Sequence, residues 1–101
     1  MYTFVRRADA QTLEAMIFAV EISQIVKKAS GLDVILNTQA FGPSNRVYWV
    51  VRGIESLDDF QKKQALLLAD SDYMSKVGEA VAGEYFIPGS FEDMLLQSVD
   101  M

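Results

Sequence analysis

Four polar residues on two neighbouring predicted β-strands have side chains that could bind a small molecule. They are Asn37, Gln39, Tyr48 and Arg52. Two amides, a phenol and a guanidinium around an apolar floor could orient a small, flat, oxygenated or anionic molecule, because ligand pockets combine apolar walls with a few polar groups. The same groups could instead form hydrogen bonds and ion pairs in a subunit interface, since buried polar groups must be paired with or without a ligand. Both interpretations stay open on residue type alone.

Arg52 and Tyr48 are the strongest candidates for chemistry among these four. If the substrate is easily deprotonated, Tyr48 would donate a hydrogen bond to the resulting oxyanion, Arg52 would supply positive charge, and the two amides would orient the molecule. A buried guanidinium is costly without an anionic partner. We therefore expect Arg52 to meet either a ligand or a carboxylate such as Asp33 or Asp93.

Three further residues are candidates for the same pocket or its entrance. Arg6 and Arg7 are adjacent in a predicted strand, so their side chains point to opposite faces of the sheet. One could enter a cavity while the other reaches solvent or a carboxylate. Tyr85 lies with Glu84 and Phe86 in a predicted loop before the last strand. This loop could form a lid over a ligand, and ordinary loop packing is the alternative.

The sequence contains neither cysteine nor histidine, which removes several kinds of chemistry. Zinc sites of the usual type, a His or Cys haem ligand, a Cys nucleophile and a His general base are excluded. The acidic groups at 58–59 and 70–72 each lie at a predicted helix start, where acids favour the helix dipole, and they offer too few ligands for an oxygen-only metal site. We therefore predict no metal and no cofactor. No catalytic residue can be assigned, and whether the chain is an enzyme stays open.

Length and composition predict one globular domain over residues 1–101. The chain is 50% hydrophobic and 23% charged, which is ordinary for a globular protein. Nine basic against fourteen acidic residues give a net charge of −5, without the concentrated positive patch that nucleic-acid binding needs. The longest apolar run falls far short of a bilayer span, so no membrane insertion is expected. The lack of cysteine fits a reducing cytoplasm.

The hydrophobic pattern predicts strands and helices along the whole chain. In order, it predicts a strand over 2–8, a helix over 11–30, strands over 32–41 and 46–53, a helix from 56, a short further helix, and a strand over 91–99. Asp9 is the expected N-cap of the first helix and Gly31 suits its left-handed end. Ser56 is the expected N-cap of the second helix, and Asp70 or Ser71 caps the third.

The central two strands form a predicted hairpin around the turn at residues 42–45, Gly-Pro-Ser-Asn. A four-residue loop places Phe41 opposite Arg46 and Ile35 opposite Arg52. The face expected to meet the helices is nearly all apolar: Leu32, Val34, Leu36, Val47, Trp49 and Val51. Trp49 on this face is predicted to pack in the core, and a ligand-stacking role is the alternative. The other face is mixed: Ile35, Asn37, Gln39, Phe41, Tyr48, Val50 and Arg52. Such a mixture is typical of a cavity wall or an interface.

The element order βαββαβ with a split second helix is that of the ferredoxin-like fold. It predicts an α+β protein with a four-stranded antiparallel sheet and helices on one face. The chain also resembles the dimeric α+β barrel superfamily, and within it NIPSNAP-like and antibiotic-monooxygenase-like small proteins. The resemblance is carried by the segments at 46–49 (Arg-Val-Tyr-Trp), 55–60, 68–73 and 86–90. It implies a dimer that resembles cofactor-free oxygenases, polyketide cyclases, isomerases, haem-binding enzymes or proteins of no known activity. Many enzymes of the group rely on a histidine that this sequence lacks.

Two functional hypotheses follow, and both assume a homodimer. The helices can cover only one face of the sheet, and an exposed apolar second face would be a liability. The first hypothesis is a pocket for a small aromatic or oxygenated metabolite, between sheet and helices or in the barrel, with cofactor-independent monooxygenase-like or cyclase-like activity. The alternative is a non-catalytic ligand-binding or accessory module that uses the same pocket or the sheet edge. Sequence alone does not separate the two.

Overall fold

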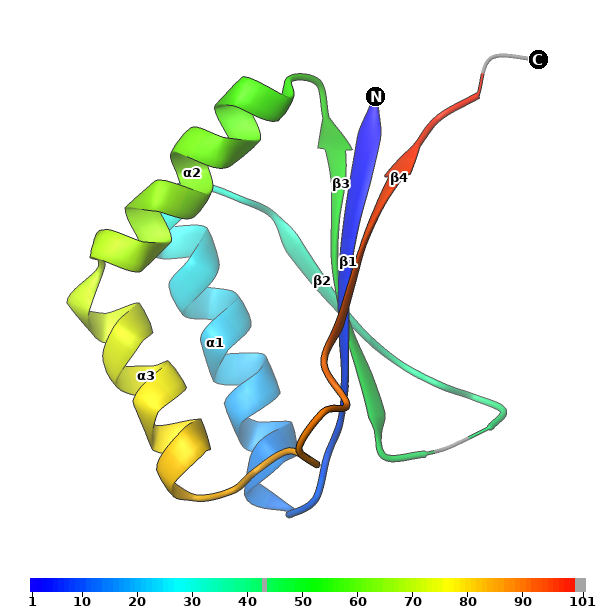
Figure 1. Cartoon of the computed structure of the whole chain (residues 1–101), viewed down its shortest axis with the longest axis vertical. Helices are drawn as coiled ribbons and strands as arrows, with labels where there is room; N and C mark the ends of the chain where they lie inside the picture. The colour runs from blue at the N-terminus through cyan, green and yellow to red at the C-terminus, as the bar shows by residue number, and fades with distance from the viewer. Residues whose placement is uncertain (43, 100–101) are drawn as a thin grey trace.

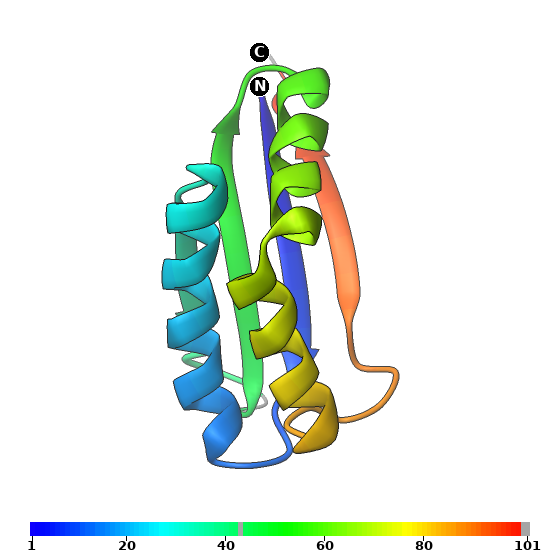
Figure 2. The same ribbon diagram turned by 90° about the vertical axis from the view of Figure 1, so that its left-hand side faces the viewer.

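The computed structural model of the chain describes residues 1–42 and 44–99, and these form an α+β fold with the element order βαββααβ (Figure 1). The elements are β1 (Tyr2–Asp9), α1 (Glu14–Ser30), β2 (Val34–Thr38), β3 (Arg46–Ile54), α2 (Leu57–Ala69), α3 (Ser71–Ala82) and β4 (Glu92–Gln97). The strands pair antiparallel in the order β2-β3-β1-β4. All three helices lie in one layer against one face of the sheet (Figure 2). The predicted ferredoxin-like architecture with a split second helix is confirmed.

Side-chain caps and a glycine define the helix ends that the sequence predicted. The hydroxyl of Ser56 accepts a hydrogen bond from the amide of Asp59 at 3.3 Å, at the start of α2. The carboxylate of Asp70 accepts from the amide of Tyr73 at 2.8 Å, which begins α3 directly after α2 ends. Gly31 ends α1 with φ of 79°, a left-handed conformation that glycine adopts without steric cost.

The predicted N-cap role of Asp9 is wrong. Strand β1 continues through Asp9, and its carboxylate accepts a hydrogen bond from Nε of Arg46 on β3 at 2.8 Å. Helix α1 begins only at Glu14, after Leu13, without a side-chain cap. The carboxylate of Asp9, which was expected to cap the helix, therefore forms an ion pair with Arg46 of the neighbouring strand.

The register of the central hairpin differs by two residues from the prediction. Ile35 lies opposite Val50 instead of Arg52, and Asn37 lies opposite Tyr48. The cause is an earlier end of β2: the connection spans residues 39–45, of which Pro43 lies outside the described residues. A shift of two keeps the side chains of Val34–Thr38 on their predicted faces, because strand side chains alternate with a period of two, whereas Gln39 and Phe41 lie in the connection and not in the strand as predicted. The last strand is also shorter than the predicted 91–99.

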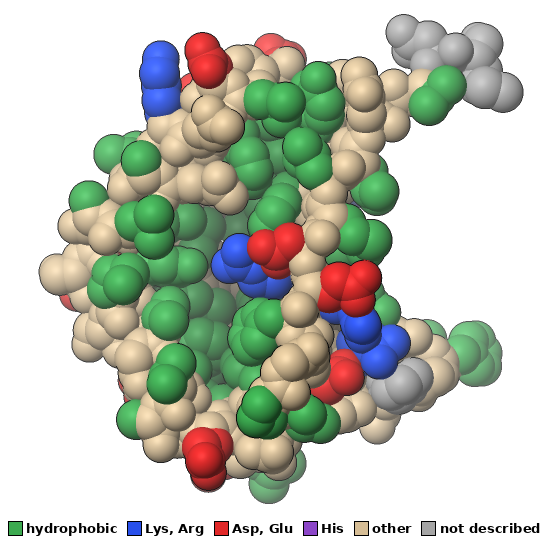
Figure 3. Space-filling model, in the orientation of Figure 1, with side chains coloured by type: hydrophobic (Ala, Val, Ile, Leu, Met, Phe, Trp, Pro, Cys, Tyr) green, Lys and Arg blue, Asp and Glu red, His purple; other side chains and the backbone are tan. Residues whose placement is uncertain are grey.

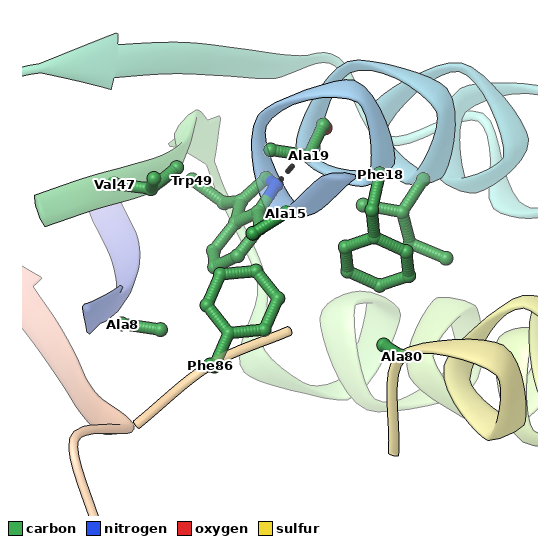
Figure 4. Close-up of a cluster of buried hydrophobic side chains, with 9 residues drawn as sticks. Ala8, Ala15, Phe18, Ala19, Val47, Trp49, Ala80 and Phe86 are labelled. Atoms are coloured by element: carbon green, nitrogen blue, oxygen red, sulfur yellow. Dashed lines mark hydrogen bonds between the residues drawn. The ribbon is translucent and has the colours of Figure 1, made fainter. Parts of the chain in front are cut away.

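The main core forms where the helices meet the middle of the sheet (Figure 4). Its buried members are Ala8, Ala15, Phe18, Ala19, Ile22, Val47, Trp49, Ala80 and Phe86. Trp49 is 9% exposed, and its indole N–H donates to the carbonyl of Ala19 on α1 at 3.3 Å. Phe86, from the loop before β4, packs on Trp49 with ring centres 5.8 Å apart. The predicted core position of Trp49 is confirmed.

Two isoleucines on α1 provide a matched test of this packing. Ile22 is 7% exposed in the core, whereas Ile17 is 62% exposed. We expect Ile22→Ala to lower the free energy of unfolding by about 2–4 kcal/mol, because it leaves a cavity. Ile17→Ala should change it by less than about 0.5 kcal/mol. Urea denaturation of both variants checks this, and equal losses would contradict the observed face of α1.

The Asp9–Arg46 pair should make stability depend on pH in a defined direction. The hydrogen bond from Arg46 holds the pKa of Asp9 below its usual 3.8, so the charged pair stabilises the fold above that value. Its contribution disappears as pH falls through the lowered folded pKa. The native chain should therefore have a higher free energy of unfolding than Asp9→Asn at neutral pH. This difference should shrink as the pH falls below about 3.8. Denaturation at a series of pH values measures it.

Asp33→Asn is the control for that experiment. The carboxylate of Asp33 lies 3.7 Å from Nζ of Lys27, and both side chains are exposed. Exposed pairs contribute little. A gap for Asp9→Asn that stays constant into strong acid would contradict the role assigned to its charge.

Candidate functional site

A cavity of about 670 Å³ lies between the helix-facing side of the sheet and the three helices. Its wall is mainly hydrophobic, and Figure 3 shows the hollow lined by apolar side chains, with basic and acidic side chains meeting at its edge. The aromatic lining residues are Phe4, Phe18, Trp49, Phe60, Tyr73, Phe86 and Phe91. The other polar lining residues are Arg6, Gln11, Gln64 and Glu84. A cavity of this size and composition is typical of small-molecule sites.

The cavity is open to solvent beside the edge strand β4. All residues of β4 are exposed, whereas β1 and β3 carry most of the buried residues of the sheet. Strand β4 lies at the edge of the sheet, beside β1. The hollow therefore opens between β4 and the helices (Figure 3).

Arg6 reaches this cavity from β1. Its position in the strand lies opposite Trp49 on β3 and Asp93 on β4. Nε donates to Oδ1 of Asp93 at 2.8 Å and Nη2 donates to Oδ2 at 2.9 Å. These hydrogen bonds lower the pKa of Asp93 and raise that of Arg6, so both groups are charged. The guanidinium also lies 5.6 Å from the ring centre of Phe4, within cation–π range.

Arg7 lies on the opposite face of β1, as the alternation of a strand requires. Its Nη2 donates to Oε2 of Glu92 at 2.7 Å. Arg6 thus lines the cavity while Arg7 reaches a carboxylate, as one of the sequence-based alternatives had it. Arg6 also binds a carboxylate, so both arginines form ion pairs. The two pairs are cross-strand contacts on opposite faces of the sheet, since Arg6 lies opposite Asp93 and Arg7 lies opposite Glu92.

Three of the four polar hairpin residues come together on the face away from the helices. The hydroxyl of Tyr48 donates to Oε1 of Gln39 at 3.2 Å, and Nε2 of Gln39 donates to the carbonyl of Phe41 at 3.1 Å. Asn37 is exposed and lies opposite Tyr48. Gln39 thus braces the β2–β3 loop against β3. A ligand-binding role for these three residues stays a prediction.

Arg52 and Tyr85 lie apart from this group. Arg52 is exposed near the other end of β3, and it forms no ion pair with any residue in the described part of the chain. Its expected place beside Ile35 was wrong because of the register shift. Tyr85 packs on Phe18, and its hydroxyl donates to Glu79 at 3.3 Å. Desolvation, followed by the charge of Glu79, raises the pKa of Tyr85. The ligand-binding roles of Arg52 and Tyr85 are untested.

The aromatic cavity wall was not found from the sequence. Phe4, Phe60 and Tyr73 belong to three different elements, and their pattern is the ordinary one of a hydrophobic core. One signal was available: Phe4, Arg6 and Ala8 alternate along β1, which places a cation on an otherwise apolar face. That single residue indicates the side of the sheet on which a polar ligand group could bind.

No group of three or more acidic side chains in the described ranges is arranged to hold a metal ion. Over the same ranges, no helix has the length and apolar character needed to cross a membrane.

Comparisons with known proteins identify structural relatives only. No protein-family model matches the sequence, and no curated protein sequence matches it. A NIPSNAP family protein of unknown function from Agrobacterium tumefaciens superposes with a TM-score of 0.73 at 21% identity, covering 95% of this chain and 86% of that one. A NIPSNAP-like domain protein from Burkholderia xenovorans gives 0.74 at 20% identity, covering 97% and 84%.

A third solved structure comes from the other group that the sequence resembles. It is a candidate antibiotic biosynthesis monooxygenase from Deinococcus radiodurans, with a TM-score of 0.68 at 10% identity, covering 100% of this chain and 95% of that one. Identities this low establish the fold and leave the activity open. The chain therefore shares its ferredoxin-like fold over nearly its full length with solved structures of NIPSNAP family proteins and of a candidate antibiotic biosynthesis monooxygenase.

Proposed function

We propose that this chain binds a small aromatic or oxygenated molecule in the cavity between its sheet and helices, and that it does so as a homodimer. The observation that supports the ligand site is a wall of aromatic side chains around about 670 Å³, with a single arginine reaching into it. Aromatic walls favour flat apolar molecules by stacking and desolvation. The polar groups at the edge would orient such a molecule.

The proposed activity is cofactor-independent chemistry of the monooxygenase or cyclase kind. A substrate acidic enough to lose its proton to solvent water would bind as an oxyanion, and the guanidinium of Arg6 with the hydroxyl of Tyr73 would stabilise that charge. Both residues line the cavity. They would take the roles that the sequence suggested for Arg52 and Tyr48. The likeness to candidate monooxygenase structures is compatible with this activity.

A second candidate function, a non-catalytic ligand-binding module, is favoured by one observation. Glu84 is the only carboxylate among the described cavity-lining residues, and it is exposed. No acid–base pair therefore faces the cavity in the described part of the chain. Native mass spectrometry of protein purified from its own host separates the two functions: a bound oxidised or cyclised product supports the enzyme, and an unmodified metabolite supports the module.

The open face of the sheet is the proposed dimer interface. Ile35, Val50 and Met94 form apolar surface there, next to the polar group of Tyr48 and Gln39. The β2–β3 loop and the end of β4 both project past the sheet on this side (Figure 1). Phe41 in that loop is 92% exposed. A second copy packed face to face would bury these side chains and remove their apolar surface from water, which is favourable.

A cavity-filling variant tests the ligand site. Val77 on α3 lines the cavity, whereas Val20 on α1 is 49% exposed outside it. We expect the neutral dye phenylnaphthylamine to bind the native chain with enhanced fluorescence. Val77→Trp should weaken binding by about tenfold or more, a loss of ~1.4 kcal/mol, because the indole occupies the site. Val20→Trp is the control, and equal binding by both variants would contradict a ligand site in this cavity.

A charge on the open face tests the dimer. Val50 lies in the middle of that face, so Val50→Lys would bury an unpaired ammonium between two sheets. We expect sedimentation at micromolar concentration to give twice the chain mass of 11.3 kDa for the native protein and the single mass for this variant. Val20→Lys on the outer surface of α1 should remain dimeric. A native chain that sediments as a monomer would overturn the proposed interface.

A further inference from the structure

We propose that the ligand of this cavity carries an acidic group, and that this group binds Arg6 on the edge of the guanidinium that Asp93 leaves free. The inference rests on the proposed small-molecule site and names the chemical class of its ligand: a flat, mostly apolar molecule with one carboxylate, sulfonate or similar oxyanion. It also assigns Asp93 a part in selecting that ligand.

Arg6 is the only cation among the described residues that line the cavity. Its neighbours along β1 and β3 on the same face are apolar: Phe4 lies with its ring centre 5.6 Å from the guanidinium, and Trp49 lies opposite Arg6 on β3. A guanidinium in such surroundings is costly unless an anion balances it. Asp93 provides that balance in the single chain, and the side chains of Arg6 and Asp93 are 39% and 47% exposed. The pair is therefore accessible from the opening of the cavity.

The geometry of this ion pair leaves donors for a ligand. An arginine carries five N–H groups, and Asp93 binds two of them, one on Nε and one on Nη2. Three N–H groups remain, enough to bind a second oxyanion with two parallel hydrogen bonds. Tyr73 also lines the cavity, and after Asp93 it is the next group that raises the pKa of Arg6.

Asp93 itself does not line the cavity, although it lies beside the group that does. Its negative charge would repel an incoming anion, so only a molecule that also gains contact with the aromatic wall would bind well. Arg6 thus attracts an acidic group while Asp93 weakens the attraction for small anions. Removing the charge of Arg6 should therefore lower the affinity for an acidic ligand, and removing the charge of Asp93 should raise it.

The equivalent ion pair on the other face supplies a control for this assignment. Arg7 and Glu92 are the next residues along β1 and β4, and their pair points away from the helices. Arg7→Met removes the same charge from the same strand without changing the cavity wall. A general effect of net charge or of β1–β4 pairing would appear in this variant as well.

Two dyes with the same aromatic skeleton test the proposal. Anilinonaphthalene sulfonate is anionic, and phenylnaphthylamine is its neutral counterpart. We expect Arg6→Met to lower the affinity for the sulfonate dye by about tenfold, because one charge-assisted contact is lost. Its affinity for the neutral dye should stay within about twofold of the native value. Asp93→Asn should bind the sulfonate several-fold more tightly than the native chain, again with little change for the neutral dye. Arg7→Met should behave like the native chain with both dyes.

The outcomes separate this inference from the proposed function. If the neutral dye does not bind the native chain, the ligand site itself is wrong. If it binds, but Arg6→Met leaves the ratio of the two affinities unchanged or Arg7→Met changes it as much, the acidic ligand class is wrong. A weaker sulfonate affinity in Asp93→Asn would overturn the part assigned to Asp93. Neutral-dye binding in each variant shows that the cavity has survived the substitution.

Discussion

The packing of Trp49 joins the sheet to α1, and the same indole forms part of the cavity wall. The indole lies between β3 and α1, where its N–H donates to the carbonyl of Ala19, and Phe86 packs on its other side. Phe86 in turn contacts Phe18, with ring centres 5.6 Å apart. These aromatic contacts fill the space at one side of the sheet with side chains. Toward the exposed strand β4, the described side chains leave the hollow open.

The edge strand β4 is attached by backbone pairing and by two ion pairs with β1. Arg6 binds Asp93 on the helix side, and Arg7 binds Glu92 on the open side. Because these are directly opposed residues, the two pairs favour the same register from both faces. Exposed ion pairs stabilise little, so their main consequence is to determine where charge lies. One guanidinium is placed at the mouth of an apolar cavity and the other in the polar region of the proposed interface.

The two faces of the sheet therefore have different proposed uses. The helix side holds an aromatic cavity with one cation, which suits a ligand with an apolar body and an acidic group. The open side combines apolar positions such as Val50 with the hydrogen-bonded pair Tyr48 and Gln39, which suits a second sheet. The open face has a mixed polar and apolar composition, which is typical of a cavity wall or an interface. Packing against a second subunit would explain that composition as well as a ligand site would. The helix-facing side, which the sequence predicts as plain core, contains the cavity.

The sequence by itself determined the element order, the helix caps at Ser56 and Asp70, the end of α1 at Gly31, and the faces of the paired residues in β2 and β3. These features depend on local conformational preference and on alternation along a strand, which a residue and its neighbours decide. Only the tertiary structure decided the pairing of Ile35 with Val50, the partner of Asp9, and the choice of Arg6 as the cavity cation. Each of these depends on a residue distant in the chain, and Arg46 engaging Asp9 is the clearest case. The cavity belongs to the same class, because a volume left unfilled between β1, β4 and the helices is a property of packing and has no pattern in the sequence.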